Sequence, residues 1–139
     1  MEVARVEVHG RDLVADGTQL GATYELRYRL EPSTLSLELV GERSLDVELG
    51  DADFFDLAWS PLFNSLPVVR DGLLREGASA HDYVMRWIDV PSLEISRSDQ
   101  HYEPSGDGVI RFSAGTFAAD IRFDDDGFVI EYPGLARRV

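Results

Sequence analysis

Apolar and polar residues alternate along much of this 139-residue chain. Between residues 24 and 30, for example, Tyr and Leu stand at every second position and charged residues stand between them. In a β-strand successive side chains point to opposite faces, so a period of two buries one face and leaves the other in water. The same period recurs at residues 35–39, 45–49, 83–88, 117–123 and 128–132. The sequence therefore predicts an all-β fold of antiparallel strands.

Short segments rich in Gly, Pro, Ser and Asp separate the predicted strands. They lie at residues 31–33, 41–42, 104–108, 114–116 and 124–127. Turns at intervals of roughly 8 to 12 residues are typical of a sandwich or barrel. We expect residues 124–127 to form a hairpin loop in which Gly127 has a positive φ. We also expect residues 1–139 to form a single β domain, with only a short helical turn within residues 71–81.

One uncharged segment interrupts the alternation. Residues 60–67 read Ser-Pro-Leu-Phe-Asn-Ser-Leu-Pro and contain two prolines. Proline fixes φ, so this segment is expected to be a loop held in one shape. Because a solvated loop is usually more polar, we expect this one either to pack over the open end of the sheet or to line a site. Our hypothesis is that residues 60–70 form the rim of a ligand site.

The charge balance is strongly acidic. Asp and Glu total 26 against 13 basic residues, every one of them arginine, which gives a net charge of −13. Repulsion among so many carboxylates destabilises a compact fold in dilute buffer, whereas at ~1 M salt the Debye length falls to about 3 Å. Lysine and cysteine are both absent. This composition predicts a halophilic protein of the haloarchaeal type, and the lack of signal-peptide features in the first five residues predicts a cytoplasmic location.

Several classes of function are not indicated. His9, His81 and His101 lack metal-ligand spacing, no nucleophile motif or glycine-rich phosphate loop occurs, and no cysteine is available. We therefore expect no metal, no cofactor and no catalytic residue. No basic patch suggests nucleic-acid binding, and no apolar run approaches the ~18 residues of a transmembrane segment. The pattern indicates no particular oligomeric state.

The C-terminal two-thirds of the chain carries a series of short motifs. These are DLAWSP from residue 56, NSLPVVR from 64, VPSLE from 90, QHY from 100, the strand 117–123, and DGFVIEYPGLARRV from 126. In this order and spacing they resemble the putative glycolipid-binding family of bacterial and archaeal proteins. The chain departs from the family pattern at Phe63, where Thr is common, at Val69, which replaces an arginine, and at Ala136, where Trp is common.

The resemblance implies a fold and a ligand. The fold would be a single antiparallel, strongly curved sheet forming an open or half barrel, similar to lipoprotein-localisation carriers. The ligand would be a glycolipid or another amphipathic small molecule held on the concave face of the sheet. Our prediction is thus a non-enzymatic binder or carrier.

Six residues are candidate ligand contacts. They are Asn64, Arg70, Trp59, Trp87, Tyr102 and Tyr132. Asn64 would bond a sugar hydroxyl and Arg70 an anionic head group, while the aromatic residues would line a cleft for an acyl chain or sugar ring. Structural roles are the alternative: Asn64 would satisfy loop backbone, Arg70 would pair with Asp56 or another acid at the edge of the core, and the aromatic rings would form plain core.

Two other functions remain as alternatives. One is an enzyme for a small polar substrate, with His101 or His81 as the base. The other is an interaction domain without a small-molecule ligand, which would present a flat apolar patch.

The charge balance generates a first prediction. The urea midpoint of unfolding should rise between dilute buffer and molar KCl, because salt screens the repulsion among the carboxylates. Urea titrations followed by circular dichroism across that range would measure it. A midpoint independent of KCl would contradict the halophilic interpretation.

Overall fold

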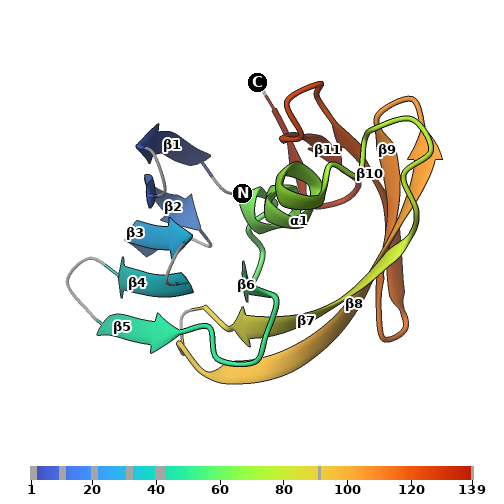
Figure 1. Cartoon of the computed structure of the whole chain (residues 1–139). Coiled ribbons are helices and arrows are strands. Elements are labelled where there is room, and N and C mark those ends of the chain that lie inside the picture. The colour runs from blue at the N-terminus through green and yellow to red at the C-terminus, as the bar shows by residue number, and fades with distance from the viewer. Residues whose placement is uncertain are drawn as a thin grey trace.

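The computed structural model describes residues 3–9, 12–19, 22–30, 33–39, 43–90 and 92–138, which form two β-sheets and one helix (Figure 1). The first sheet is a five-stranded meander. Its strands, in spatial order, are β1 (Val3–His9), β2 (Asp12–Gln19), β3 (Ala22–Leu30), β4 (Ser33–Leu39) and β5 (Arg43–Glu48). Each strand pairs antiparallel with the next one in the chain.

The second sheet has seven strands and curls into a half barrel (Figure 1). In chain order its strands are β6 (Phe54–Leu57), β7 (His81–Ile88), β8 (Ile95–Gly106), β9 (Val109–Ala114), β10 (Phe117–Phe123), β11 (Val129–Tyr132) and β12 (Ala136–Arg137). They lie side by side in that same order. Helix α1 (Leu62–Asp71) lies inside the curl (Figure 1).

An all-β fold was predicted, and the structure is mostly β with one short helix. The half-barrel shape is confirmed, but the prediction of a single antiparallel sheet is wrong. The described residues form two sheets, and β6 pairs with β7 in parallel. The reason is the connection between these two strands. A chain that leaves one strand and returns through a helix re-enters the sheet in the same direction.

The expected loop at residues 60–67 is also wrong, because most of it belongs to α1. Pro61 precedes the helix with φ −61°, a value that suits a helix start, and Gly72 ends it in the left-handed region. The ten-residue helix contains Pro67 and buries both apolar and polar residues. It therefore lacks the clear apolar stripe by which a surface helix is recognised. Among the described residues, no helix is long and apolar enough to cross a membrane.

The predicted turns are confirmed where glycine permits them. Asp107 and Gly108 both have positive φ and join β8 to β9 in a two-residue turn. Gly127 has φ +89° in the loop between β10 and β11. These tight connections keep successive strands adjacent, so the curved sheet is built almost entirely from hairpins.

Two apolar clusters hold the described structure together. The first consists of Phe55, Leu57, Phe63, Ile88 and Val90, and β5 contributes Leu45 and Val47 from the other sheet. The second joins α1 to the curled sheet. It contains Val68 and Leu73 together with inward-facing residues such as Tyr83, Tyr102, Ile110, Phe112 and Ile121. Burial of α1 thus fills the part of the concave face nearest β10 and β11.

A close contact fixes the hairpin β10–β11 against α1. The Val129 amide donates a hydrogen bond of 3.1 Å to Ser65 Oγ. A Cβ placed on Gly127 would lie 2.8 Å from Val69 Cγ2. Glycine at this position therefore allows both the positive φ and the approach of the helix.

We predict that Gly127→Ala lowers the free energy of unfolding by about 2–4 kcal/mol, since it combines left-handed strain with a steric clash. The matched control is Gly115→Ala. Gly115 has φ +58° but no atom within 4 Å of the added methyl, so it carries only the strain of about 1–2 kcal/mol. Urea unfolding would measure both, and equal losses would mean that the hairpin does not press on α1.

Candidate functional site

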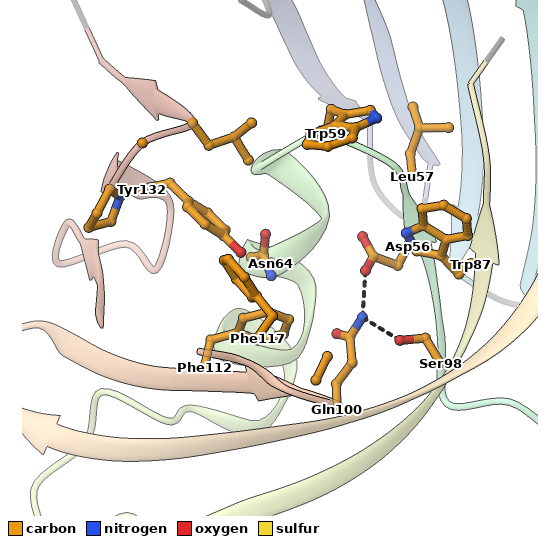
Figure 2. A pocket seen from close by; sticks show the side chains of 15 residues that line it. Asp56, Leu57, Trp59, Asn64, Trp87, Ser98, Gln100, Phe112, Phe117 and Tyr132 are labelled. Atoms are coloured by element: carbon orange, nitrogen blue, oxygen red, sulfur yellow. Dashed lines mark hydrogen bonds between the residues drawn. The ribbon is translucent and has the colours of Figure 1, made fainter. Parts of the chain in front are cut away.

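A cavity of about 520 Å³ lies between α1 and the concave face of the curled sheet. Its polar lining residues are Asp56, Ser60, Asn64, Ser98 and Gln100. The rest of the lining is Leu57, Trp59, Trp87, Phe112, Ala114, Phe117, Tyr132, Pro133, Gly134 and Leu135. Figure 2 shows Asp56, Gln100 and Trp87 on one side, with Tyr132, Phe117 and Phe112 on the other. The cavity therefore has a polar side and an aromatic side.

A chain of hydrogen bonds runs along the polar side. Asn64 Nδ2 donates to the Tyr102 hydroxyl at 3.1 Å, and that hydroxyl donates to Gln100 Oε1 at 3.3 Å. Gln100 Nε2 then donates to Asp56 Oδ2 at 2.5 Å and to Ser98 Oγ at 3.3 Å (Figure 2). The chain joins α1, β8 and β6, so it fixes the side chains on three separate elements relative to one another.

Asp56 is the acidic group of the cavity. Burial raises the pKa of its carboxyl to about 6, while the hydrogen bond from Gln100 acts in the opposite direction. Burial also raises the pKa of the Tyr102 and Tyr132 hydroxyls, so both stay protonated at neutral pH. At neutral pH the site thus combines one carboxylate with neutral hydroxyl and amide groups.

Trp59 is held at the rim in an unfavourable conformation. It follows β6 in a turn closed by the Ser60 amide and the Leu57 carbonyl, and its φ is +64°. That position favours glycine, and a bulky side chain there is strained. Even so, the indole is 56% exposed and lines the cavity. The strained turn thus holds an exposed apolar ring at the rim of the cavity.

The aromatic side is built by cross-strand stacking. Phe117 of β10 stacks on Tyr132 of β11, with ring centroids 6.3 Å apart, and Phe112 of β9 packs edge-on against Tyr132 at 6.4 Å. Phe117 nevertheless remains 50% exposed. These rings form a firm apolar wall that is open to solvent on one side.

The structure brings most of the predicted contacts together. Trp59, Asn64, Trp87 and Tyr132 line the cavity. Tyr102 is fully buried behind it and touches the site through Asn64 and Gln100. The chain has only two tryptophans, and both line this one cavity.

Arg70 lies outside the lining. Its guanidinium forms two hydrogen bonds to the Asp71 carboxylate, at 2.8 and 2.9 Å, and sits 4.1 Å above the Phe54 ring. The Asp71 side chain also accepts a bond of 2.7 Å from the Tyr83 hydroxyl. Of the structural alternatives, pairing with Asp56 is not observed, and Arg70 pairs with another acid, Asp71. Arg70 instead secures the C-terminal end of α1 to β6 and β7.

Two polar residues of the cavity, Asp56 and Gln100, were not predicted as ligand contacts. Asp56 was considered only as a partner for Arg70, and Gln100 was given no role. A signal was available for Gln100. Gln100 lies two positions before Tyr102 in a strand, so both side chains point to the same inward face. A polar residue at an inward position requires a hydrogen-bond partner.

His81 and His101 lie outside the cavity lining. His101 Nδ1 lies 2.7 Å from Asp82 Oδ1 in a shallow depression of about 280 Å³ that also includes Ser113. Because His101 alternates with Gln100 and Tyr102, it points to the opposite face of the sheet. His81 Nδ1 lies 3.0 Å from the Ser79 carbonyl. Within the part of the chain that the structure describes, no three His, Asp or Glu side chains gather in a way that could hold a metal ion.

Comparison with known proteins gives a family and a fold. The family model described as putative glycolipid-binding matches residues 39–138. A crystal structure of a DUF1089 family protein from Pseudomonas aeruginosa superposes with a TM-score of 0.77, covering 99% of this chain and 92% of that chain at 21% sequence identity. At that identity the likeness shows the fold alone. No curated protein matches the chain.

The raised pKa of Asp56 makes a prediction about stability. The folded protein keeps this proton up to about pH 6, whereas an ordinary Asp releases it near 3.8, so the contribution of Asp56 to stability falls as pH rises between these values. Asp56→Asn removes the buried charge and should raise the free energy of unfolding by about 1–2 kcal/mol at pH 8. Near pH 4 the difference from wild type should vanish.

Urea unfolding at the two pH values measures this effect. The control is Asp125→Asn, which removes the same charge from the exposed loop after β10. Stabilisation by Asp56→Asn that is equal at pH 4 and pH 8 would show that Asp56 is not the group that titrates.

Proposed function

Because this chain belongs to the putative glycolipid-binding family, we propose that it binds a glycolipid-like amphipathic molecule in the cavity between α1 and the curled sheet. The cavity is the single observation that carries this proposal. Its volume of about 520 Å³ lies within the range of roughly 300–1,000 Å³ that is common for small-molecule sites. Its mainly apolar walls with a few converging polar groups are also typical of such sites.

The two sides of the cavity suit the two parts of an amphipathic ligand. Phe112, Phe117 and Leu135 would contact its apolar chain, which binding removes from water. Asp56, Gln100 and Asn64 would face its hydroxylated head. The exposed indole of Trp59 would lie against the apolar face of a sugar ring. The strained turn would then serve to present that ring at the mouth of the cavity.

The proposal is binding without chemical conversion. Among the described lining residues the ionisable groups are Asp56 and Tyr132, and Tyr132 stays protonated. Of the alternatives, an enzyme would most readily use the pair formed by His101 and Asp82, which lies on the other face of the sheet. The Asp82 side chain is 88% exposed, so water screens the pair, and we assign it no role in the site.

The setting of the protein is part of the same proposal. The net charge of −13 and the absence of lysine support the proposal that the protein functions in a salt-rich cytoplasm. In that setting electrostatic attraction over long distances is weak, and affinity depends mainly on apolar burial, which salt strengthens.

We predict that Trp59→Gly weakens binding of octyl β-glucoside by about three- to tenfold, the scale of one lost aromatic contact. The same change should alter the free energy of unfolding by less than about 1 kcal/mol, since glycine relieves the strained φ at the cost of chain entropy. Calorimetric titration below the micellar concentration measures the affinity, and urea unfolding measures the stability.

The matched control is Ile130→Ala. Ile130 is an exposed apolar residue outside the cavity, so its loss should leave the affinity unchanged. Emission of the two cavity tryptophans provides a second readout in the wild-type protein. Absence of both heat and an emission change with octyl β-glucoside would contradict the proposed function.

A further inference from the structure

The hydrogen bonds on the polar side of the cavity all run in one direction. Asn64 donates to Tyr102, Tyr102 donates to Gln100, and Gln100 donates to Asp56. The second amide hydrogen of Gln100 is directed to Ser98 Oγ. The donors of Gln100 and Tyr102 are therefore committed to protein acceptors, and the chain ends on a carboxylate, which can only accept while it is ionised.

Asp56 is the charged group that a ligand would meet in the cavity. No donor among the described residues is paired with Asp56 Oδ1, and Figure 2 shows this oxygen turned toward the open centre of the cavity. Asn64 uses one amide hydrogen for Tyr102, so its carbonyl oxygen and its second amide hydrogen remain for a ligand. Tyr132 contributes a hydroxyl that both donates and accepts. No arginine, lysine or histidine occurs among the described lining residues.

We propose that this cavity selects ligands whose head group donates hydrogen bonds, as the hydroxyls of a sugar or polyol do, and rejects phosphate, sulfate and carboxylate heads, with Asp56 as the deciding residue. This inference rests on the proposed function and specifies its ligand class. A hydroxyl that replaces water at Asp56 Oδ1 restores the hydrogen bond that the water made. An anionic head would instead meet a like charge in a partly buried site, with no cation to offset its loss of hydration.

The test compares three amphiphiles with the same eight-carbon chain. Octyl β-glucoside donates through hydroxyls, octyl sulfate is an anion without donors, and octyltrimethylammonium is a cation without donors. Titrations followed by emission of Trp59 and Trp87 are run in about 1 M KCl, where the long-range repulsion from the net charge of −13 is screened. We expect octyl β-glucoside to bind at least about tenfold more tightly than either of the others, the scale of one hydrogen bond to a charged group.

Any other order of affinity among the three amphiphiles contradicts either this inference or the proposed function. Octyl sulfate binding as tightly as the glucoside would overturn the inference and leave the proposed function standing. Tighter binding of octyltrimethylammonium would also overturn it, because charge and not hydrogen-bond donation would then select the ligand. No emission change with any of the three would contradict the proposed function itself.

The variant Asp56→Asn tests whether Asp56 is the residue that causes this selectivity. The asparagine keeps the shape of the side chain but exchanges one acceptor for a donor. Affinity for octyl β-glucoside should fall about tenfold, and its preference over octyl sulfate should shrink or reverse. Asp125→Asn, which removes the same charge outside the cavity, should preserve the wild-type ranking. If Asp56→Asn does not fold, the ranking of the three amphiphiles on the wild-type protein still decides the proposal.

Discussion

The packing of α1 into the concave face of the curled sheet is the contact on which the rest of the described structure depends. The helix connects β6 to β7, so it makes that pair parallel and adds an edge strand to a sheet otherwise made of hairpins. Phe63 and Val68 enter two different apolar clusters from this one short helix. Because α1 fills only part of the concave face, the remaining space is the cavity, with walls supplied by both helix and sheet.

The polar side of the cavity combines stabilising and destabilising features. Gln100 and Asn64 are buried, Asp56 is partly buried, and each polar group is connected to the next, which limits the free energy lost on removing them from water. The arrangement still leaves a carboxylate whose pKa is raised by burial, and a tryptophan with a left-handed backbone beside it. Both features disfavour the fold locally, and both face the same space. Such a coincidence is expected where a binding site has been favoured over maximal stability.

The fold shows which features can be predicted from local pattern. The alternation of apolar and polar residues identified β3, β4, β5, β7, β10 and β11. A strand with one buried face shows that alternation directly in its sequence. Strands β1, β2, β6, β8, β9 and β12 were not identified, and α1 was taken for a loop. Helix α1 buries Asn64 and Ser65 as well as Phe63, so its sequence shows no apolar stripe, and Pro61 before it and Pro67 within it suggested an irregular loop. Its burial is decided by partners far away in sequence, such as Val129.

The sequence by itself determined the β class of the protein, its turns at Gly115 and Gly127, its acidic composition, and three of the aromatic residues that line the cavity, Trp59, Trp87 and Tyr132. These properties depend on the period of the side chains and on their chemistry, both of which are local. Only the tertiary structure decided that Asp56, Asn64 and Gln100 meet and that Arg70 turns away to Asp71. Those residues lie on β6, α1 and β8, and their meeting depends on the crossover through the helix and on the curl of the sheet. A hydrogen bond between residues 44 positions apart has no local pattern, because its partners are chosen by packing of the whole fold.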